Sequence, residues 1–330
     1  MALAAVLVLV SAGAVLRGKR SPAAPLPPTA EELRTTPHLV FVTTKSGVLF
    51  GRMAVVALNA PDAAPAMTDM RCDRVHFAAG HGVCLGEEPV DGHHAFFAST
   101  FDGALRPATR LPLPGPPSRT RVSPGGRYAA VTVFTTGESY ACDFTTRTTL
   151  LDLQAGGTLG DLESFKVSRD GQPFRAADFN FWGVTFAADE DRFFATLASA
   201  HKTYLVAGQV SERTLRVLRD GVECPSLSPD GTRLAFKKRD GDRGWRLHVL
   251  DVRTLVDRPI EGERRSIDDQ VEWLDDDHVL YGFVESTGLP EQASNIWVAS
   301  VADGRPARIF VRSAASPAVV RATSAGASLR

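Results

Sequence analysis

The chain has 330 residues, of which 44% are hydrophobic and 23% are charged, and its formal net charge is −1. This composition is typical of a globular protein long enough to bury a large core. The near-zero charge excludes a strongly basic nucleic-acid binder, and no charged tail points to an oppositely charged partner.

The first segment, residues 1–20, is expected to be a signal peptide or a membrane anchor. Residues 1–16 are almost all apolar, and three basic residues follow them. The run is shorter than the roughly 20 residues of a spanning helix, and Ala12-Gly13-Ala14 fits a cleavage site. No basic residue precedes the run, so a membrane tether through residues 2–16 stays open beside cleavage. Both alternatives predict an extracytoplasmic protein.

The next segment, residues 21–37, is rich in Pro and Ala and is expected to be an extended linker with one helical turn at Ala30–Arg34. The folded part is expected to be a single domain over residues 38–322. Residues 323–330 are expected to form a disordered tail.

The chain has four cysteines, an even count that permits disulfides in an exported protein. Cys72 and Cys84 flank two short apolar runs. If these runs are antiparallel neighbours, the two sulfurs lie within bridging distance, and the alternative is two buried free thiols. No C-x-x-C and no histidine at ligand spacing accompany the cysteines, so no metal site is expected.

After residue 38, short apolar runs bounded by Gly, Pro, Asp and Thr dominate the chain, which is typical of an all-β fold. The clearest repeat unit places Ser228-Pro229-Asp230-Gly231 between two apolar runs and ends a third run at Asp251. Similar units have their turns near residues 80, 125, 190 and 276, at spacings of about 40 to 47 residues with one of 65. A period near 40 with four strands per unit predicts the blades of a β-propeller.

The number of blades depends on two segments. Residues 156–180 form an insertion. Recognition of a partner and docking of its phenylalanines on a neighbouring blade are the two alternatives, and docking is expected. His38–Leu58 contains strands but no inner strand, and Ser316–Ala322 could supply it, so a sixth blade built from both ends would close the ring. We therefore predict six four-stranded antiparallel blades. Seven blades are the alternative if the insertion contains a strand pair.

The motifs SPDGTRLAF at residues 228–236 and SPGGRY at residues 123–128 resemble the WD-like propeller repeat of the TolB family. The resemblance is strong over residues 220–255 and weaker over residues 72–312. It implies an extracytoplasmic β-propeller. The chain shows no counterpart of the small α/β domain that precedes the propeller in TolB, so a role in the Tol-Pal envelope system does not carry over.

Motifs for catalysis and for cofactors are missing from the sequence. It contains no G-x-S-x-G elbow, no phosphate-binding loop and no G-x-G-x-x-G, and Gly137–Ala141 only approaches the elbow. Asp275–Asp277 stand at a repeat turn and are expected to be solvated rather than to bind a cation. His93 and His94 are adjacent and should point to opposite faces of a strand. No cofactor is expected.

Residues just before each inner strand are expected to line the mouth of the central channel, where they could grip a peptide or a sugar. The alternative is that these charges only solvate the channel. The predicted binding residues are Arg71, Asp73, Arg119, Arg121, Asp178, Asn180, Trp182, Glu223, Asp268, Asp269 and Gln270.

The leading functional hypothesis is a non-enzymatic, monomeric scaffold that binds a protein or peptide at the cell envelope and binds no nucleic acid. One alternative is a propeller lyase or glycan hydrolase that uses Asp178 and Asp269, whose separation would matter for glycoside hydrolysis. The other alternative is a carbohydrate-binding module of the envelope.

Overall fold

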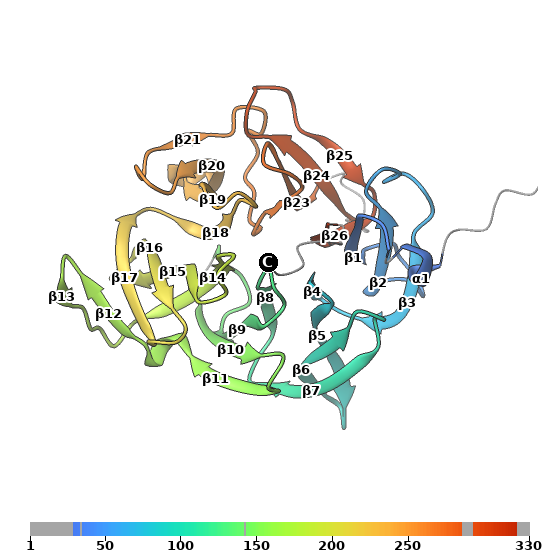
Figure 1. Ribbon diagram of the computed structural model, residues 1–330, viewed down its shortest axis with the longest axis horizontal. Helices are drawn as coiled ribbons and strands as arrows, with labels where there is room; N and C mark the ends of the chain where they lie inside the picture. Colours follow the sequence, from blue (N-terminus) through green and yellow to red (C-terminus); the bar gives the residue numbers. More distant parts are fainter. Residues whose placement is uncertain (1–28, 34, 142, 286–292, 322–330) are drawn as a thin grey trace, which may run out of the picture.

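The computed structural model describes residues 29–33, 35–141, 143–285 and 293–321. These residues form six antiparallel sheets that stand around a central axis (Figure 1). Five sheets have four strands, and one has four strands plus an added pair. The prediction of a six-bladed propeller is confirmed.

The strands of each blade are given from the innermost to the outermost. Blade A contains β26 (Ala314–Val320), β1 (His38–Thr43), β2 (Arg52–Ala57) and β3 (Ala66–Arg71). Blade B contains β4 (Arg74–Ala78), β5 (His81–Val90), β6 (His93–Asp102) and β7 (Pro107–Leu113). Blade C contains β8 (Pro117–Val122), β9 (Tyr128–Thr136), β10 (Thr145–Asp152) and β11 (Gly157–Asp161). Blade D contains β14 (Asn180–Phe186), β15 (Arg192–Ser199), β16 (Lys202–Gln209), β17 (Thr214–Asp220), β12 (Lys166–Arg169) and β13 (Gln172–Pro173). Blade E contains β18 (Glu223–Leu227), β19 (Arg233–Arg239), β20 (Trp245–Asp251) and β21 (Asp257–Pro259). Blade F contains β22 (Glu272–Trp273), β23 (His278–Val284), β24 (Ser294–Ser300) and β25 (Arg308–Val311).

Blade A closes the ring with strands from both ends of the domain. Its inner strand β26 pairs antiparallel with β1, with Val319 opposite Leu39 and Ala318 opposite Val40. The predicted sixth blade built from both ends is therefore confirmed. This pairing covers an edge of β1 that would otherwise be open to another chain.

The sequence suggested that residues 156–180 form a single insertion, but the structure divides this segment between blades C and D. Its first part is β11, the outermost strand of blade C. A short 3-10 helix, Leu162–Ser164, leads to the β12–β13 hairpin, which adds to the outer edge of blade D through a parallel pairing of β12 with β17. The hidden strand pair thus exists, but strands of four and two residues are too short to form a seventh blade.

The core lies between neighbouring blades, because each sheet packs its apolar faces against the next. Between blades A and F, Leu39 and Phe41 pack in one cluster with Leu280 and Ile296. Phe165 of the segment after β11 packs against Phe193 of blade D, with ring centroids 6.2 Å apart. The segment therefore does dock on a neighbouring blade, as expected.

The repeat turn works through local hydrogen bonds. The Asp230 carboxylate accepts from the Ser228 hydroxyl at 2.5 Å and from the Thr232 backbone N–H at 3.0 Å. Gly231 has a φ of +71°, a conformation that a side chain would strain. The motif is thus turn chemistry, as its sequence indicated.

A disulfide crosses the connection between blades A and B. It joins Cys72 and Cys84, the expected pair, with Cα atoms 5.3 Å apart. The two apolar runs are the antiparallel strands β4 and β5. Cys72 lies just before β4, and Cys84 lies within β5. Cys224 is a buried free thiol, and Cys142 lies outside the described residues.

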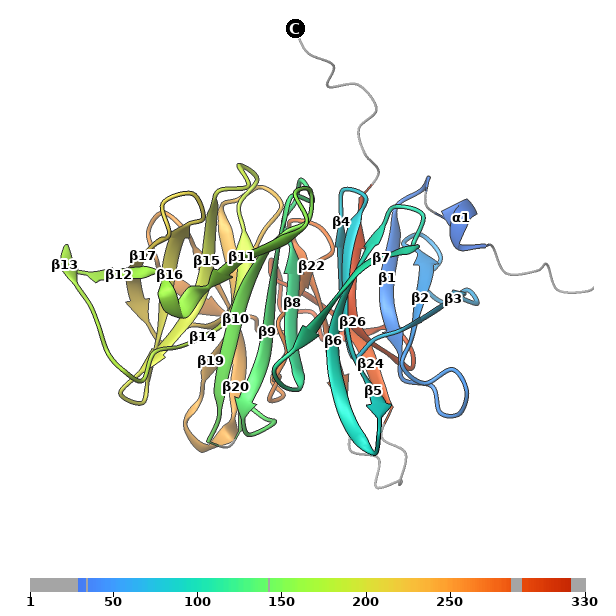
Figure 2. The same cartoon turned by 90° about the horizontal axis from the view of Figure 1, so that it is seen from below.

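The propeller has two distinct faces (Figure 2). We call the face with the turns between first and second strands the turn face; α1 (Ala30–Leu33), capped by Thr29, lies at this end. The opposite face, where the chain enters each inner strand, is the entry face, toward which β5 points in Figure 2. No helix in the described residues is long and apolar enough to cross a membrane. The predicted signal or anchor and the predicted tail at 323–330 lie outside the described residues.

Candidate functional site

Two expected channel residues lie at the rim of the entry face instead. Arg71 ends the outermost strand of blade A, and its guanidinium donates to the carbonyls of Phe50 at 2.6 Å and Val48 at 3.0 Å. Asp178 accepts hydrogen bonds from Ser199 Oγ and from the following backbone N–H, both at 2.7 Å. Neither residue lies at the channel, because Arg71 still belongs to the outermost strand β3 of blade A and Asp178 lies in the connection that leads to β14.

Asn180 lies between blades C and D, and Trp182 packs in a buried aromatic cluster with Phe134 and Tyr140 of blade C and Trp245 of blade E. Asn180 Oδ1 accepts from the backbone N–H and the hydroxyl of Thr146, at 2.7 and 2.6 Å. Trp182 is 1% exposed and packs against Tyr140 and Phe144, with centroids 5.5 and 5.2 Å away. Both side chains are buried against protein groups, Asn180 by Thr146 and Trp182 by aromatic rings.

Three other expected residues converge on a lysine that the sequence argument had missed. Lys237 of β19 is fully buried and donates to the Asp268 carboxylate, with a Glu223 oxygen 3.9 Å from Nζ. Its ammonium also lies 4.4 Å from the ring centroid of Tyr140 and 4.3 Å from that of Trp245. We call this group the lysine cluster.

Arg119 joins the lysine cluster from blade C, with Nη2 3.6 Å from the Asp268 carboxylate. Burial alone would raise the pKa of Asp268, but the charges of Lys237 and Arg119 outweigh it and lower the pKa below its usual value. Burial raises the pKa of Glu223. The cluster therefore holds ionised Asp268 between two cations near the entry face. Asp73, by contrast, has an exposed position in the connection from blade A to blade B.

The next expected residues, Asp269 and Gln270, line a narrow throat of about 20 Å³ together with Arg74, Arg119 and Arg121. Gln270 Nε2 donates to the carbonyls of Val184 and Pro225, both at 2.9 Å. Both carbonyls lie where β14 and β18 bulge away from their partner strands. Gln270 thus replaces lost ladder hydrogen bonds, which is a structural role.

The throat ends in a second buried group, which we call the histidine cluster: His76, Arg121 and Glu272. The Arg121 guanidinium donates to Glu272 Oε2 and, at 2.9 Å, to the carbonyl of Val271. His76 Nδ1 accepts from the Val122 backbone N–H at 3.0 Å, so its proton is on Nε2, 3.4 Å from Glu272 Oε2. The three side chains come from blades B, C and F and cross-link them.

Protonation in the histidine cluster follows from this geometry. Burial would raise the pKa of Glu272, but the Arg121 charge and the His76 hydrogen bond lower it to about 2. Burial, reinforced by the Arg121 charge, lowers the pKa of His76. At neutral pH the cluster is therefore an Arg121–Glu272 ion pair with a neutral imidazole.

Beyond the histidine cluster, the channel opens on the turn face into a funnel of about 630 Å³. This volume lies within the range of roughly 300–1,000 Å³ of ligand pockets. Apolar residues form most of its lining, and the repeat turn Ser228–Gly231 borders it. Its wall includes Phe186, Phe194, Leu227, Val252, Trp273 and Val319.

The sequence argument placed the candidate site at the entry-face end of the channel, and the larger opening lies at its turn-face end. The repeat turn Ser228–Gly231 borders this larger opening. The clusters themselves had a signal in the sequence: His76, Lys237 and Glu272 are polar residues inside short apolar strands, and a buried charge needs partners.

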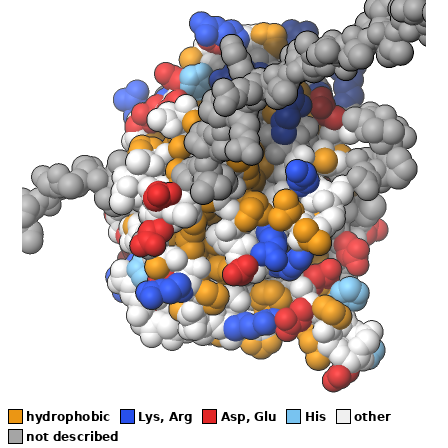
Figure 3. Space-filling view, turned by 90° about the vertical axis from the view of Figure 1, so that its right-hand side faces the viewer, with side chains coloured by type: hydrophobic (Ala, Val, Ile, Leu, Met, Phe, Trp, Pro, Cys, Tyr) orange, Lys and Arg blue, Asp and Glu red, His pale blue; other side chains and the backbone are white. Residues whose placement is uncertain are grey.

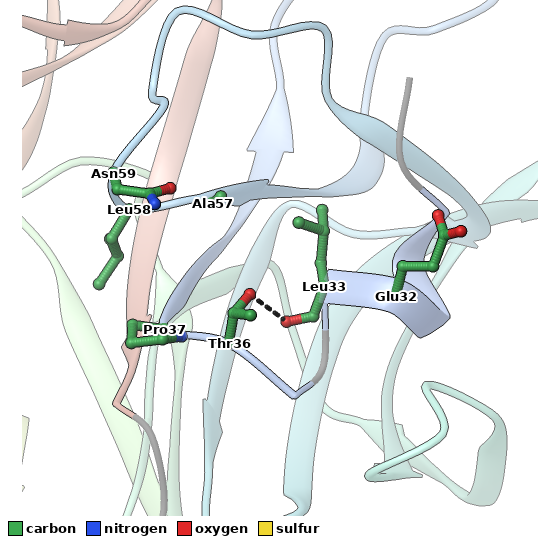
Figure 4. A pocket seen from close by; sticks show the side chains of 7 residues that line it. All are labelled: Glu32, Leu33, Thr36, Pro37, Ala57, Leu58 and Asn59. Atoms are coloured by element: carbon green, nitrogen blue, oxygen red, sulfur yellow. Dashed lines mark hydrogen bonds between the residues drawn. The ribbon is translucent and has the colours of Figure 1, made fainter. Parts of the chain in front are cut away.

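A larger hollow of about 940 Å³ lies between α1 and the end of β2 (Figure 4). It is lined by Glu32, Leu33, Thr36, Pro37, Ala57, Leu58 and Asn59. Its polar groups serve the helix. The Glu32 carboxylate accepts from the Thr29 backbone N–H at 2.7 Å, and the Thr36 hydroxyl donates to the Leu33 carbonyl at 3.1 Å. We therefore favour the funnel, which carries fixed charges at its base, as the ligand site.

Within the described residues, no group of three or more His, Cys, Asp or Glu side chains could hold a metal ion. In the triple-aspartate turn, Asp275 accepts from the Asp277 backbone N–H at 2.8 Å, and Asp276 accepts from that of Asp230 at 3.2 Å. His94 lies 3.2 Å from Glu87. These acids serve turns and blade contacts.

Glycoside hydrolysis by Asp178 and Asp269 is not supported by their surroundings. The Ala200 backbone N–H holds the pKa of Asp178 below its usual value, and Asp269 Oδ2 accepts from the Gly282 backbone N–H at 2.8 Å. A general acid needs a raised pKa and access to substrate.

A closed ring of six antiparallel blades around a narrow polar channel defines a six-bladed β-propeller. No family model and no curated protein matches the sequence. The fold is similar to that of a protein from Agrobacterium tumefaciens described as TolB, with 11% identity and a TM-score of 0.50, over 83% of this chain and 87% of that one.

Two further solved structures are similar to the chain. A chain of a nidogen/laminin complex has 10% identity and a TM-score of 0.52, over 87% of this chain and 99% of its own. A puromycin-hydrolyzing peptidase from Mycobacterium tuberculosis has 12% identity and a TM-score of 0.47, over 80% of this chain and 42% of its own. At such identities the likeness concerns the fold alone, which is that of a TolB-like propeller.

Proposed function

We propose that the chain is an extracytoplasmic binding scaffold whose funnel on the turn face takes an extended segment of a protein partner. The observation that carries this proposal is the funnel: an apolar, open cavity of about 630 Å³ whose base is closed by the histidine cluster. Apolar walls provide affinity for side chains, and a fixed polar base provides orientation.

The rigidity of the base supports binding rather than a moving part. His76 and Arg121 both contact the Glu272 carboxylate, and the three side chains tie three blades together. The partner thus meets a preorganised cavity and pays little ordering entropy on binding.

The disulfide supports the extracytoplasmic location, because such bonds persist in oxidising compartments. The apolar start of the sequence supports it independently. A reporter fused to residues 1–40 should be exported from the cytoplasm, and a cytosolic reporter would contradict this part of the proposal.

The funnel is tested by selecting peptides from a displayed random library against the purified chain. Ala188, an exposed residue of the funnel lining, is replaced in Ala188→Trp, which should weaken the selected peptides at least tenfold by filling the cavity. Ala155→Trp, exposed on the outer edge of blade C, is the matched control and should bind like wild type.

Peptides that bind Ala188→Trp as well as wild type would exclude the funnel as their site. A glycan array run beside the selection separates the carbohydrate-binding alternative. Glycan binding that Ala188→Trp removes, without any selected peptide, would replace the protein partner by a sugar.

A further inference from the structure

A hollow of about 380 Å³ lies between blade A and the end of β25 in blade F. Its volume falls within the range of small-molecule pockets. Most of the described lining is apolar and includes Phe41, Leu49, Val56, Pro65, Met67 and Val311. Figure 3 faces the outer side of blade A, where hydrophobic side chains lie exposed among charged ones. We call this cavity the side hollow.

Two cations of the side hollow lie at its entry-face end. Its described lining contains three charged residues, Lys45, Asp62 and Arg312. The Thr44 backbone N–H donates to the Ser313 carbonyl at 2.8 Å, which joins the segment that carries Lys45 to the segment that carries Arg312. Asp62 lies in the β2–β3 loop, at the opposite end of the antiparallel strands of blade A. The entry-face end therefore carries two exposed cations, and the carboxylate lies toward the turn face.

The uncharged polar groups at this end already have partners. The Thr43 hydroxyl donates to the Ser313 carbonyl at 3.3 Å and accepts from the Lys45 backbone N–H at 3.2 Å. The Ser313 backbone N–H donates to Asn295 Oδ1 at 2.9 Å. A buried peptide would bring an N–H and a carbonyl with each residue, and each would need a partner. An alkyl chain brings no such groups, so the lining favours a hydrocarbon chain over a peptide.

The wall of the side hollow on the β1–β2 loop is held in place. Leu49 lines the hollow, and its neighbours Val48 and Phe50 are 79% and 58% exposed. The Arg71 guanidinium donates to the carbonyls of Val48 and Phe50, at 3.0 and 2.6 Å. A ligand would therefore meet a preorganised wall and would lose little free energy in ordering it.

We propose that the side hollow binds one free amphiphile with an anionic head, of the fatty-carboxylate class. The carboxylate lies between Lys45 and Arg312, and the alkyl chain lies along the apolar residues of β1 and β2. Ionic hydrogen bonds at the head fix the orientation, and burial of the chain provides affinity. The side hollow and the funnel share no lining residue, so either proposal can fail without the other.

The head group is tested by titration calorimetry of the purified full chain with decanoate, 1-decanol and decyltrimethylammonium, each below its micelle concentration. Decanoate should bind with one-to-one stoichiometry and more tightly than the alcohol, and the cationic amphiphile should bind most weakly. The double variant Lys45→Gln/Arg312→Gln should lower the affinity for decanoate about tenfold and leave that for decanol unchanged. A variant that binds decanoate as wild type does would overturn the proposal.

The position of the chain is tested by filling the side hollow. Ala63 is exposed and lines the hollow, so Ala63→Trp should weaken decanoate binding at least tenfold. Ala64, the next residue, is equally exposed and is not part of the lining, so Ala64→Trp is the matched control. Both variants should melt at the temperature of wild type, because both side chains project from an exposed loop.

Three further results would overturn the proposal. The first is a wild-type chain that does not bind decanoate. The second is decanoate binding that Ala188→Trp in the funnel removes and Ala63→Trp does not. The third is binding to phosphatidylglycerol vesicles without binding to free decanoate, which would replace the free amphiphile by a bilayer surface.

Discussion

The lysine cluster and the histidine cluster both bury charges in the same channel, but they balance them differently. In the histidine cluster, one arginine meets one carboxylate, and both are about nine-tenths buried. In the lysine cluster, a fully buried ammonium meets Asp268, whose side chain is one-third exposed, and it also lies between two aromatic rings. In the histidine cluster the buried charge is balanced by a single ion pair, whereas in the lysine cluster it is balanced by a carboxylate together with two aromatic rings.

This difference shows how a propeller can close its channel at one depth and still carry polar groups toward both openings. A buried pair is costly to break, because the remaining charge has no solvent to replace its partner. Cation–π contacts and partial solvation soften that cost. The histidine cluster therefore acts as the rigid base of the funnel, whereas the lysine cluster tolerates change.

The largest effect is expected from Glu272→Leu. It leaves the buried guanidinium of Arg121 without its carboxylate, and breaking such a pair costs about 3–5 kcal/mol of unfolding free energy. Urea denaturation followed by circular dichroism measures the loss. Asp69→Ala, which removes a fully exposed partner of Arg52, is the control and should unfold like wild type. A Glu272→Leu variant as stable as the control would show that the pair adds nothing to the fold.

Acid should destabilise the protein through the histidine cluster in two steps. Because the folded pKa of His76 is lowered, the unfolded chain takes up a proton first, and stability falls as the pH drops below about 6.5. Because the pKa of Glu272 is about 2 in the folded state against 4.5 in the reference, its contribution of about 3 kcal/mol is present above pH 4.5 and is lost between 4.5 and 2.

The check is the unfolding free energy from pH 8 to pH 3 for wild type, His76→Gln and Glu272→Gln. The first step should be missing from His76→Gln, and the second should be missing from Glu272→Gln. If all three profiles were parallel, the cluster would have no part in the acid response.

A smaller loss, about 1–3 kcal/mol, is expected from Lys237→Met. Asp268 loses one of its two cations, but it keeps Arg119 at 3.6 Å and contact with solvent. Lys238→Met is the matched control on the same strand, because Lys238 is one-third exposed and pairs with Asp257 at 3.0 Å. The Lys238 variant should lose less. The reverse order would mean that the buried lysine is compensated no better than a surface one.

The sequence allowed the architecture to be predicted because repetition is a strong signal. A turn such as Ser228–Gly231 recurs with each blade, and its hydrogen bonds are local. The closing strand β26 could be predicted because blade A lacked an inner strand. The site could not be predicted in the same way: Trp182 precedes a repeat turn as Arg121 does, but it packs in an aromatic cluster instead of joining the charged residues of the channel. The partners of Lys237 come from segments far apart in the chain, and no local sequence pattern indicates that these segments meet in the fold.

The smallest expected effect is the coupling between the two clusters. The groups that shift the pKa of Glu272 are Arg121, His76 and Arg321, and none of them belongs to the lysine cluster. Sites without shared partners usually combine within about 0.5 kcal/mol. A double-mutant cycle of Glu272→Leu and Lys237→Met should therefore give a coupling free energy below that value. A coupling above about 1 kcal/mol would show that the throat transmits strain, and the two clusters would then have to be treated as one buried network rather than two.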